Sequence, residues 1–240
     1  MKKQLSFPTL FIAAILLCSC GIIRKAPKYS FADGYYYTDL GGYGQTKVYV
    51  ENSEDSITAY SIENGQKIFS TDTSRTAVRS FPQGSSKSIT NAVNFKQVGF
   101  DVDFLTIPFK VRPARAGIPA QFTTDLNGAV YLGYRADKYQ LSYKQTPTNR
   151  YEKQTTHFGF SMGFFTGLGG TAMNESVTDN QVTYQYNGIA WSKGLAGIFG
   201  INNFTIGVTL GWDHLVDKNK SVWIYQGRPW LGLAFGLNLN

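Results

Sequence analysis

Charged residues are scarce in this chain. They make up 16% of its 240 residues, whereas roughly a quarter is usual in soluble domains, and aromatic residues reach 15%. The positive excess, a formal net charge of +7, is not gathered into a Lys/Arg cluster, so nucleic acid is not an expected partner. This composition argues against a cytosolic enzyme.

Cysteines and long apolar runs are also few. Cys18 and Cys20 are the only cysteines, and both lie at the end of an N-terminal leader. The apolar run from Leu10 to Leu17 is too short for a transmembrane helix, which needs about 20 apolar residues. No later segment has a convincing helical period. With the leader removed and Cys20 modified, disulfide and thiol chemistry are excluded.

The leader has the features of an export signal. MKKQLSFPTLFIAAILLCSC combines two lysines, an apolar run and small residues near the expected cleavage point. Its end, Leu17-Cys18-Ser19-Cys20, resembles the lipobox of bacterial lipoproteins. The resemblance implies a signal peptide over 1–19 and a lipid attached to Cys20, the first mature residue. An ordinary signal peptide with two incidental cysteines is the alternative.

The N-terminal third of the mature chain is polar. Residues 20–44 lack periodicity and are expected to form a lipidated tether. Residues 45–93 predict a polar β meander and a loop, with strand-like pieces in TKVYVE, SITAYSI and KIFST, and a tight turn at Asn64-Gly65. The Ser/Thr-rich stretch 72–92 is expected to be a long loop.

From residue 94 to the end, bulky apolar residues alternate with small ones. In NFTIGVTLGWDHL the even positions from Phe204 to Trp212 are large and apolar, while the odd positions are Thr, Gly and Asp. HFGFSMGFFTGLGG and RPWLGLAFGLNLN repeat the pattern. A strand on a soluble core would alternate with well-solvated residues instead.

This alternation predicts an all-β fold, an antiparallel transmembrane β-barrel over 94–240. Lipid requires every backbone polar group to be paired, so spanning strands must close into a barrel. The bulky face would contact hydrocarbon and the small face would line a narrow lumen, which Tyr131, Phe165 and Trp230 help to fill.

About eight strands are expected. Seven are predicted at 97–111, 119–135, 138–146, 154–169, 182–200, 203–215 and 221–239. Breaks in parity predict bulges near Phe104-Leu105 and Asn187-Gly188. An eighth strand would come from within 45–62, because bacterial single-chain barrels have even strand numbers. Trp212, Trp223 and Tyr225 would lie at one membrane interface.

The last strand resembles the assembly signal of outer-membrane barrels, although the chain ends in Asn240 rather than an aromatic residue. DFLTIPFKVRP and WIYQGRPWLGLAFGLNLN also resemble segments of small, largely uncharacterised Gram-negative outer-membrane β-barrel proteins. The resemblance implies residence in the outer membrane, with its lipid and the barrel-assembly machinery as partners. It implies no activity.

Several charged residues share the small-residue parity and are expected to point into the lumen. They are predicted to form a salt-bridge network, with ligand or cation binding as the alternative. The residues are Asp101, Asp103, Asp125, Arg135 and Asp213.

Catalytic residues are not apparent. His157 and Ser161 share a face but lie about 13 Å apart at 3.3 Å per residue, and His214 points away from Asp213. GLGGTA lacks the Lys of a phosphate loop, and no metal-ligand spacing or cofactor motif occurs.

We therefore expect an outer-membrane lipoprotein barrel with a structural, assembly or surface-interaction role, with an envelope protein as a candidate partner, and without catalysis or cofactor. Two alternatives stay open. One is a lipid-modifying hydrolase or acyltransferase of the outer membrane. The other is a soluble, lipocalin-like periplasmic lipoprotein that binds an apolar ligand.

Overall fold

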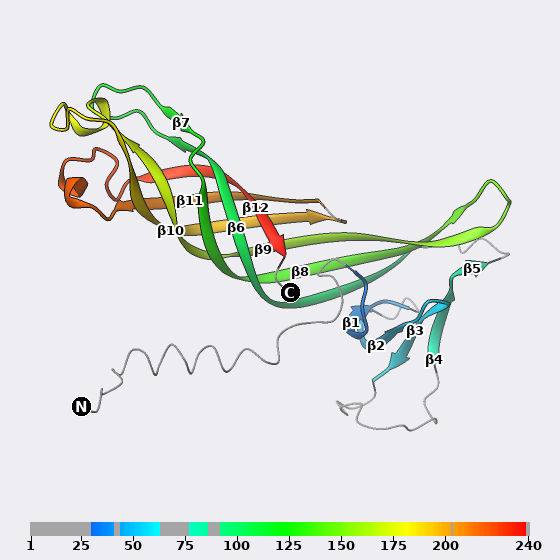
Figure 1. Ribbon diagram of the computed structural model, residues 1–240. Helices are drawn as coiled ribbons and strands as arrows, with labels where there is room; N and C mark the ends of the chain where they lie inside the picture. Colours follow the sequence, from blue (N-terminus) through cyan, green and yellow to red (C-terminus); the bar gives the residue numbers. More distant parts are fainter. Residues whose placement is uncertain (1–29, 41–43, 63–76, 86–91, 203, 239–240) are drawn as a thin grey trace, which may run out of the picture.

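The fold is all-β and antiparallel in a computed structural model that describes residues 30–40, 44–62, 77–85, 92–202 and 204–238 (Figure 1). No helix among these residues is long and apolar enough to cross a membrane. The strands are β1 (Gly34–Thr38), β2 (Thr46–Asn52), β3 (Ser56–Ser61), β4 (Ala77–Pro82), β5 (Gly84–Ser85), β6 (Val93–Arg112), β7 (Gln121–Thr123), β8 (Asn127–Gln145), β9 (Tyr151–Met173), β10 (Tyr186–Ile201), β11 (Phe204–Leu215) and β12 (Pro229–Asn238).

Six long strands form a closed ring. β6, β8, β9, β10, β11 and β12 pair in that order, and β12 pairs back onto β6 from Leu231↔Val111 to Asn238↔Asp103. The ring therefore closes without any strand from residues 45–62. The expected count of about eight strands was too high.

The count was too high partly because β8 is one strand, not two. Residues 119–135 and 138–146 were predicted as separate strands, with a break at residues 136–137. Asp137 instead pairs with Gln97 of β6 and Gly159 of β9, and the strand runs on without a change of parity. The sequence of one strand does not show which strands flank it, and here β6 and β9 continue on both sides of the predicted break.

The predicted bulges also differ from the structure. On β6 the inward parity switches between Ile107 and Lys110, and the pairing with β12 slips at the same place. Pro108 lies there, and proline has no N–H for a regular ladder, so it favours such a break. β10 pairs with β9 in uninterrupted register through Asn187 and Gly188, so no bulge occurs there.

The last strand begins later than predicted. It was expected from residue 221 but starts at Pro229. A 3-10 turn, η2 (Lys218–Ser221), comes before it. The backbone N–H of Asn219 donates to the Asp217 carboxylate at 2.8 Å, which caps the start of this turn. A second such turn, η1 (Ser176–Thr178), lies between β9 and β10. Both turns belong to the connections at one end of the ring.

At the other end β6, β8 and β9 run on beyond the ring and carry a smaller unit built from β1 to β5 (Figure 1). β1 pairs with β6, and β5 pairs with β9 at Gly84↔Glu152, so this sheet also returns to the long strands. It encloses its own core of aromatic and aliphatic residues: Phe31, Tyr36, Val48, Val50, Ile57, Ala59, Phe81, Val93, Phe95, Tyr139 and Leu141.

β2 and β3 match the predicted pieces TKVYVE and SITAYSI closely. β1 lies within the segment expected to be a tether, and β4 lies within the expected loop 72–92. The tyrosines of β1 have high β propensity, a signal that the prediction overlooked. Cys20, Asn64-Gly65 and the piece KIFST lie outside the described residues.

Candidate functional site

The outer face of the ring is apolar. Phe164, on β9, is 71% exposed. On β11 the bulky residues of one parity point outward, and the glycines of the other parity, Gly207 and Gly211, are buried inside the ring. Large exposed side chains cover every strand of the ring: Val98, Phe100, Phe104, Val130, Leu132, Tyr134, Phe158, Phe160, Met162, Leu168, Ile189, Trp191, Leu195, Phe199, Ile201, Phe204, Val208, Leu210, Leu231 and Leu233. We call this set with Phe164 the apolar belt.

The apolar belt stops abruptly where the long strands leave the ring. Along the outward face of β9 it ends at Phe158, and Thr156, Gln154 and Glu152 follow. On β8 the outward residues beyond Tyr134 and Ala136 are Lys138, Gln140, Ser142 and Lys144. On β6 the outward residue before Val98 is Lys96, which pairs with Lys138. One edge therefore separates apolar from polar surface across three neighbouring strands.

Near the opposite edge two tryptophans flank a lysine. Trp191 and Lys193 lie on β10, the ammonium 4.7 Å from the indole centroid, and Lys193 pairs across the strands with Trp212. The Trp191 indole N–H donates to the hydroxyl of Thr166 at 2.8 Å. Trp212 is half-buried on the outward parity of β11. Trp191 and Lys193 were not singled out from the sequence.

Asp213 is the centre of the charged interior. Its fully buried carboxylate accepts hydrogen bonds from the Ser192 hydroxyl at 2.6 Å and the Trp230 indole at 2.8 Å. The Lys110 ammonium lies 3.1 Å from it and the Arg112 guanidinium 2.7 Å. Lys110 also donates to Asn127 at 2.8 Å. The carboxylate therefore has four donors from three strands, β6, β10 and β12, which satisfies a charge that would be costly to bury alone.

Lys110 and Arg112 were missed by sequence analysis. Both have even numbers, whereas the inward positions earlier on β6, such as Asp101 and Asp103, are odd. The change of parity at Pro108 turns the two basic residues inward. A bulge placed at that proline would have revealed them. Asp125 is half-buried next to this cluster and acts electrostatically on Lys110.

A second interior cluster lies closer to the N-terminal unit. The Asp137 carboxylate is 2.7 Å from the Arg135 guanidinium and 2.7 Å from Nε2 of His157. The His157 ring also packs on Tyr139 at 4.8 Å between centroids. Ser161 shares a hydrogen bond of 2.7 Å with the Tyr131 hydroxyl. His157 and Ser161 therefore have separate partners, as their predicted separation implies.

Asp101 and Asp103 are buried on β6, and with Arg135 and Ser161 they line a void of about 10 Å³. A void of this size holds one water at most. Apolar side chains fill the ring elsewhere, including the predicted Tyr131, Phe165 and Trp230. The described residues include no group of three His, Cys, Asp or Glu side chains that could hold a metal ion.

Trp223 and Tyr225 do not stand on the outer face. They precede β12 and are buried with Met173, Val177 and Leu215 at the end of the ring where the long connections lie. The prediction that they lie at a membrane interface on the outer face is therefore wrong. They pack inside this end of the ring and cover it. The alternation that suggested a strand here comes from residues that pack into this end cluster.

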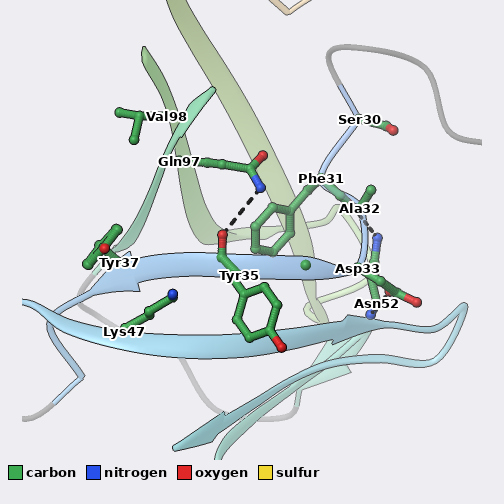
Figure 2. Close-up of a pocket in the computed structure, with 11 residues that line it drawn as sticks. Ser30, Phe31, Ala32, Asp33, Tyr35, Tyr37, Lys47, Asn52, Gln97 and Val98 are labelled. Atoms are coloured by element: carbon green, nitrogen blue, oxygen red, sulfur yellow. Dashed lines mark hydrogen bonds between the residues drawn. The ribbon is translucent and has the colours of Figure 1, made fainter. Parts of the chain in front are cut away.

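The N-terminal unit has a cavity of about 730 Å³ where β1 and β2 approach β6 (Figure 2). Tyr35, Tyr37 and Val98 are exposed along it. The Gln97 side-chain amide donates to the backbone carbonyl of Tyr35 at 3.3 Å, which ties β1 to β6. The cavity thus borders the edge of the apolar belt.

No protein-family model, curated protein or solved structure matches this chain.

Proposed function

We propose that the six-stranded ring is an outer-membrane β-barrel that anchors the N-terminal unit at the membrane surface, and that the protein is a lipoprotein with a structural or interaction role. The observation that carries this proposal is the apolar belt and its sharp edge on β6, β8 and β9. A soluble protein gains nothing from exposing so much contiguous apolar surface.

The height of the belt supports a membrane-spanning role. From Phe158 to Leu168 on β9 there are ten residue steps. A rise of about 3.3 Å per residue and a tilt of about 40° give a band about 25 Å tall, which is the height of outer-membrane barrel bands. Lys193 lies near the edge, where a long side chain can reach water while its stem stays in lipid.

The filled interior favours an anchor over a pore. Aromatic side chains and the Asp213 cluster occupy the lumen of the ring, and the void beside Asp101 and Asp103 measures only about 10 Å³. Buried ion pairs whose opposite charges are matched inside the protein are poorly suited to solute passage. The separate partners of His157 and Ser161 give no support to a hydrolase.

Membrane fractionation with and without boiling tests the proposal. We expect the unboiled protein to sit in the outer-membrane fraction and to migrate differently from the boiled protein in SDS gels, because a closed barrel resists unfolding by SDS. The variant Cys20→Ala, which removes the proposed lipid anchor, should keep both properties. Its release into the soluble fraction by washing without detergent would overturn the barrel proposal and favour a soluble lipoprotein.

A further inference from the structure

A cavity of about 270 Å³ lies at the end of the ring that carries the long connections. Its volume is about nine times the roughly 30 Å³ that a water molecule takes in the liquid. Arg112 of β6, Trp223 and Tyr225 line it together with Phe122 and Val177. The walls are therefore partly apolar and partly polar, as in sites for small organic ligands.

Three of the lining residues each have a buried polar atom with no hydrogen-bond partner: Nε of Arg112, Nε1 of Trp223 and the hydroxyl of Tyr225. Their side chains are at most 3% exposed. Buried polar groups in folded proteins are nearly always paired, because leaving one unpaired costs about 1–3 kcal/mol. Three such groups in one small cavity indicate a ligand that would satisfy them.

The chemistry of these groups selects an anion. The Arg and Trp nitrogens can only donate, and the Tyr hydroxyl can donate. The remaining guanidinium nitrogens of Arg112 are already used, by Asp213 at 2.7 Å and by Thr123 at 3.3 Å. No Asp or Glu occurs among the described residues that line the cavity. An acceptor-only ligand with negative charge fits this set of donors best.

The electrostatic surroundings agree. Burial raises the pKa of the Tyr225 hydroxyl, and the nearby cations Arg112 and Arg115 oppose that rise. The hydroxyl therefore stays neutral and able to donate at physiological pH. The Arg112 guanidinium lies 5.6 Å from the ring centroids of both Trp223 and Tyr225, so charge and aromatic surface meet in one place.

We propose that this cavity binds a small organic carboxylate, with the carboxylate against Arg112, Trp223 and Tyr225 and the apolar body beside Phe122. The site goes beyond the proposed anchoring role. It does not depend on that role, because its lining residues lie at one end of the ring and not in the apolar belt. A carboxylate rather than phosphate is favoured because the apolar wall can cover a hydrocarbon body and the donors are few.

Calorimetric titration of the folded, detergent-solubilised full chain with benzoate tests the proposal. We expect one benzoate to bind per chain, and Tyr225→Phe and Trp223→Phe each to weaken binding about tenfold, because each removes one hydrogen bond to a charged acceptor. Tyr184→Phe is the matched control and should bind like the unaltered protein. Tyr184 lies in the β9–β10 connection at the same end of the ring, and its exposed hydroxyl accepts a hydrogen bond from the side-chain amide of Asn219 at 3.3 Å.

Benzamide and inorganic phosphate complete the experiment. Equal binding of neutral benzamide would overturn charge recognition, and binding of phosphate without benzoate would overturn the choice of a carboxylate. Unchanged affinity in both cavity variants, or no heat of binding at millimolar benzoate, would refute the site. The heat-dependent gel mobility of each variant shows that it is folded. Two variants are used so that a folding failure of one still leaves a result.

Discussion

At the scale of single residues, Asp213 connects most of the ring. Its carboxylate is bonded from β6, β10 and β12 while it belongs to β11, so one side chain ties four of the six strands together. Two cations face this carboxylate, with Asp125 as a half-buried neighbour of Lys110. The balance of charge in this cluster therefore depends mainly on Asp213.

We expect Asp213→Asn to lower the free energy of unfolding by about 3–5 kcal/mol, because it leaves Lys110 and Arg112 buried without their shared counter-charge. Urea titration of the folded protein, or the temperature at which the gel mobility shift is lost, measures the change. Asp125→Asn is the control and should cost much less, since Asp125 is only half-buried. Equal effects of the two variants would contradict the central role of Asp213.

At the scale of elements, the alternation of bulky and small residues predicted the long strands and their outward faces well. It did so because a strand places neighbours on opposite faces whatever it pairs with. The break at residues 136–137 was predicted wrongly, because Asp137 lies within β8 and its carboxylate contacts Arg135 and His157 in the interior cluster. Lys110 and Arg112 were missed because a single bulge reverses the parity of everything after it. Pairing partners and bulges are non-local, and one sequence does not reveal them.

Glycines on β9 offer an element-scale test of close strand packing. A Cβ at Gly163 would collide with the backbone of Leu132 and Gly133 on β8, whereas a Cβ at Gly170 on the same strand would meet nothing within 4 Å. We expect Gly163→Ala to destabilise the fold by about 1–3 kcal/mol and Gly170→Ala to be neutral or slightly stabilising. Thermal loss of the gel mobility shift compares the two. Similar behaviour of both variants would mean that β8 and β9 can move apart at little cost.

At the scale of the whole molecule, the six-stranded ring and the sheet of the N-terminal unit share three strands. β6, β8 and β9 pass without interruption from the ring into the N-terminal unit, whose core includes Phe95 and Tyr139 from those same strands. The outward side chains change along the way from apolar to polar. If the ring is embedded in lipid, as proposed, the N-terminal unit is held at a fixed height and angle next to the membrane, because no flexible linker separates the two.

The last prediction uses this change of surface along one strand. Phe164 and Gln154 are both exposed on the outward face of β9, Phe164 within the apolar belt and Gln154 in the polar extension. In a bilayer, Phe164→Arg should cost about 2–4 kcal/mol of folding free energy, as expected for Arg near the midplane, while Gln154→Arg should cost close to nothing. Equilibrium folding into phospholipid vesicles measures both. In a soluble protein each arginine would be equally well hydrated, so equal stability of the two variants would show that the apolar belt does not face lipid.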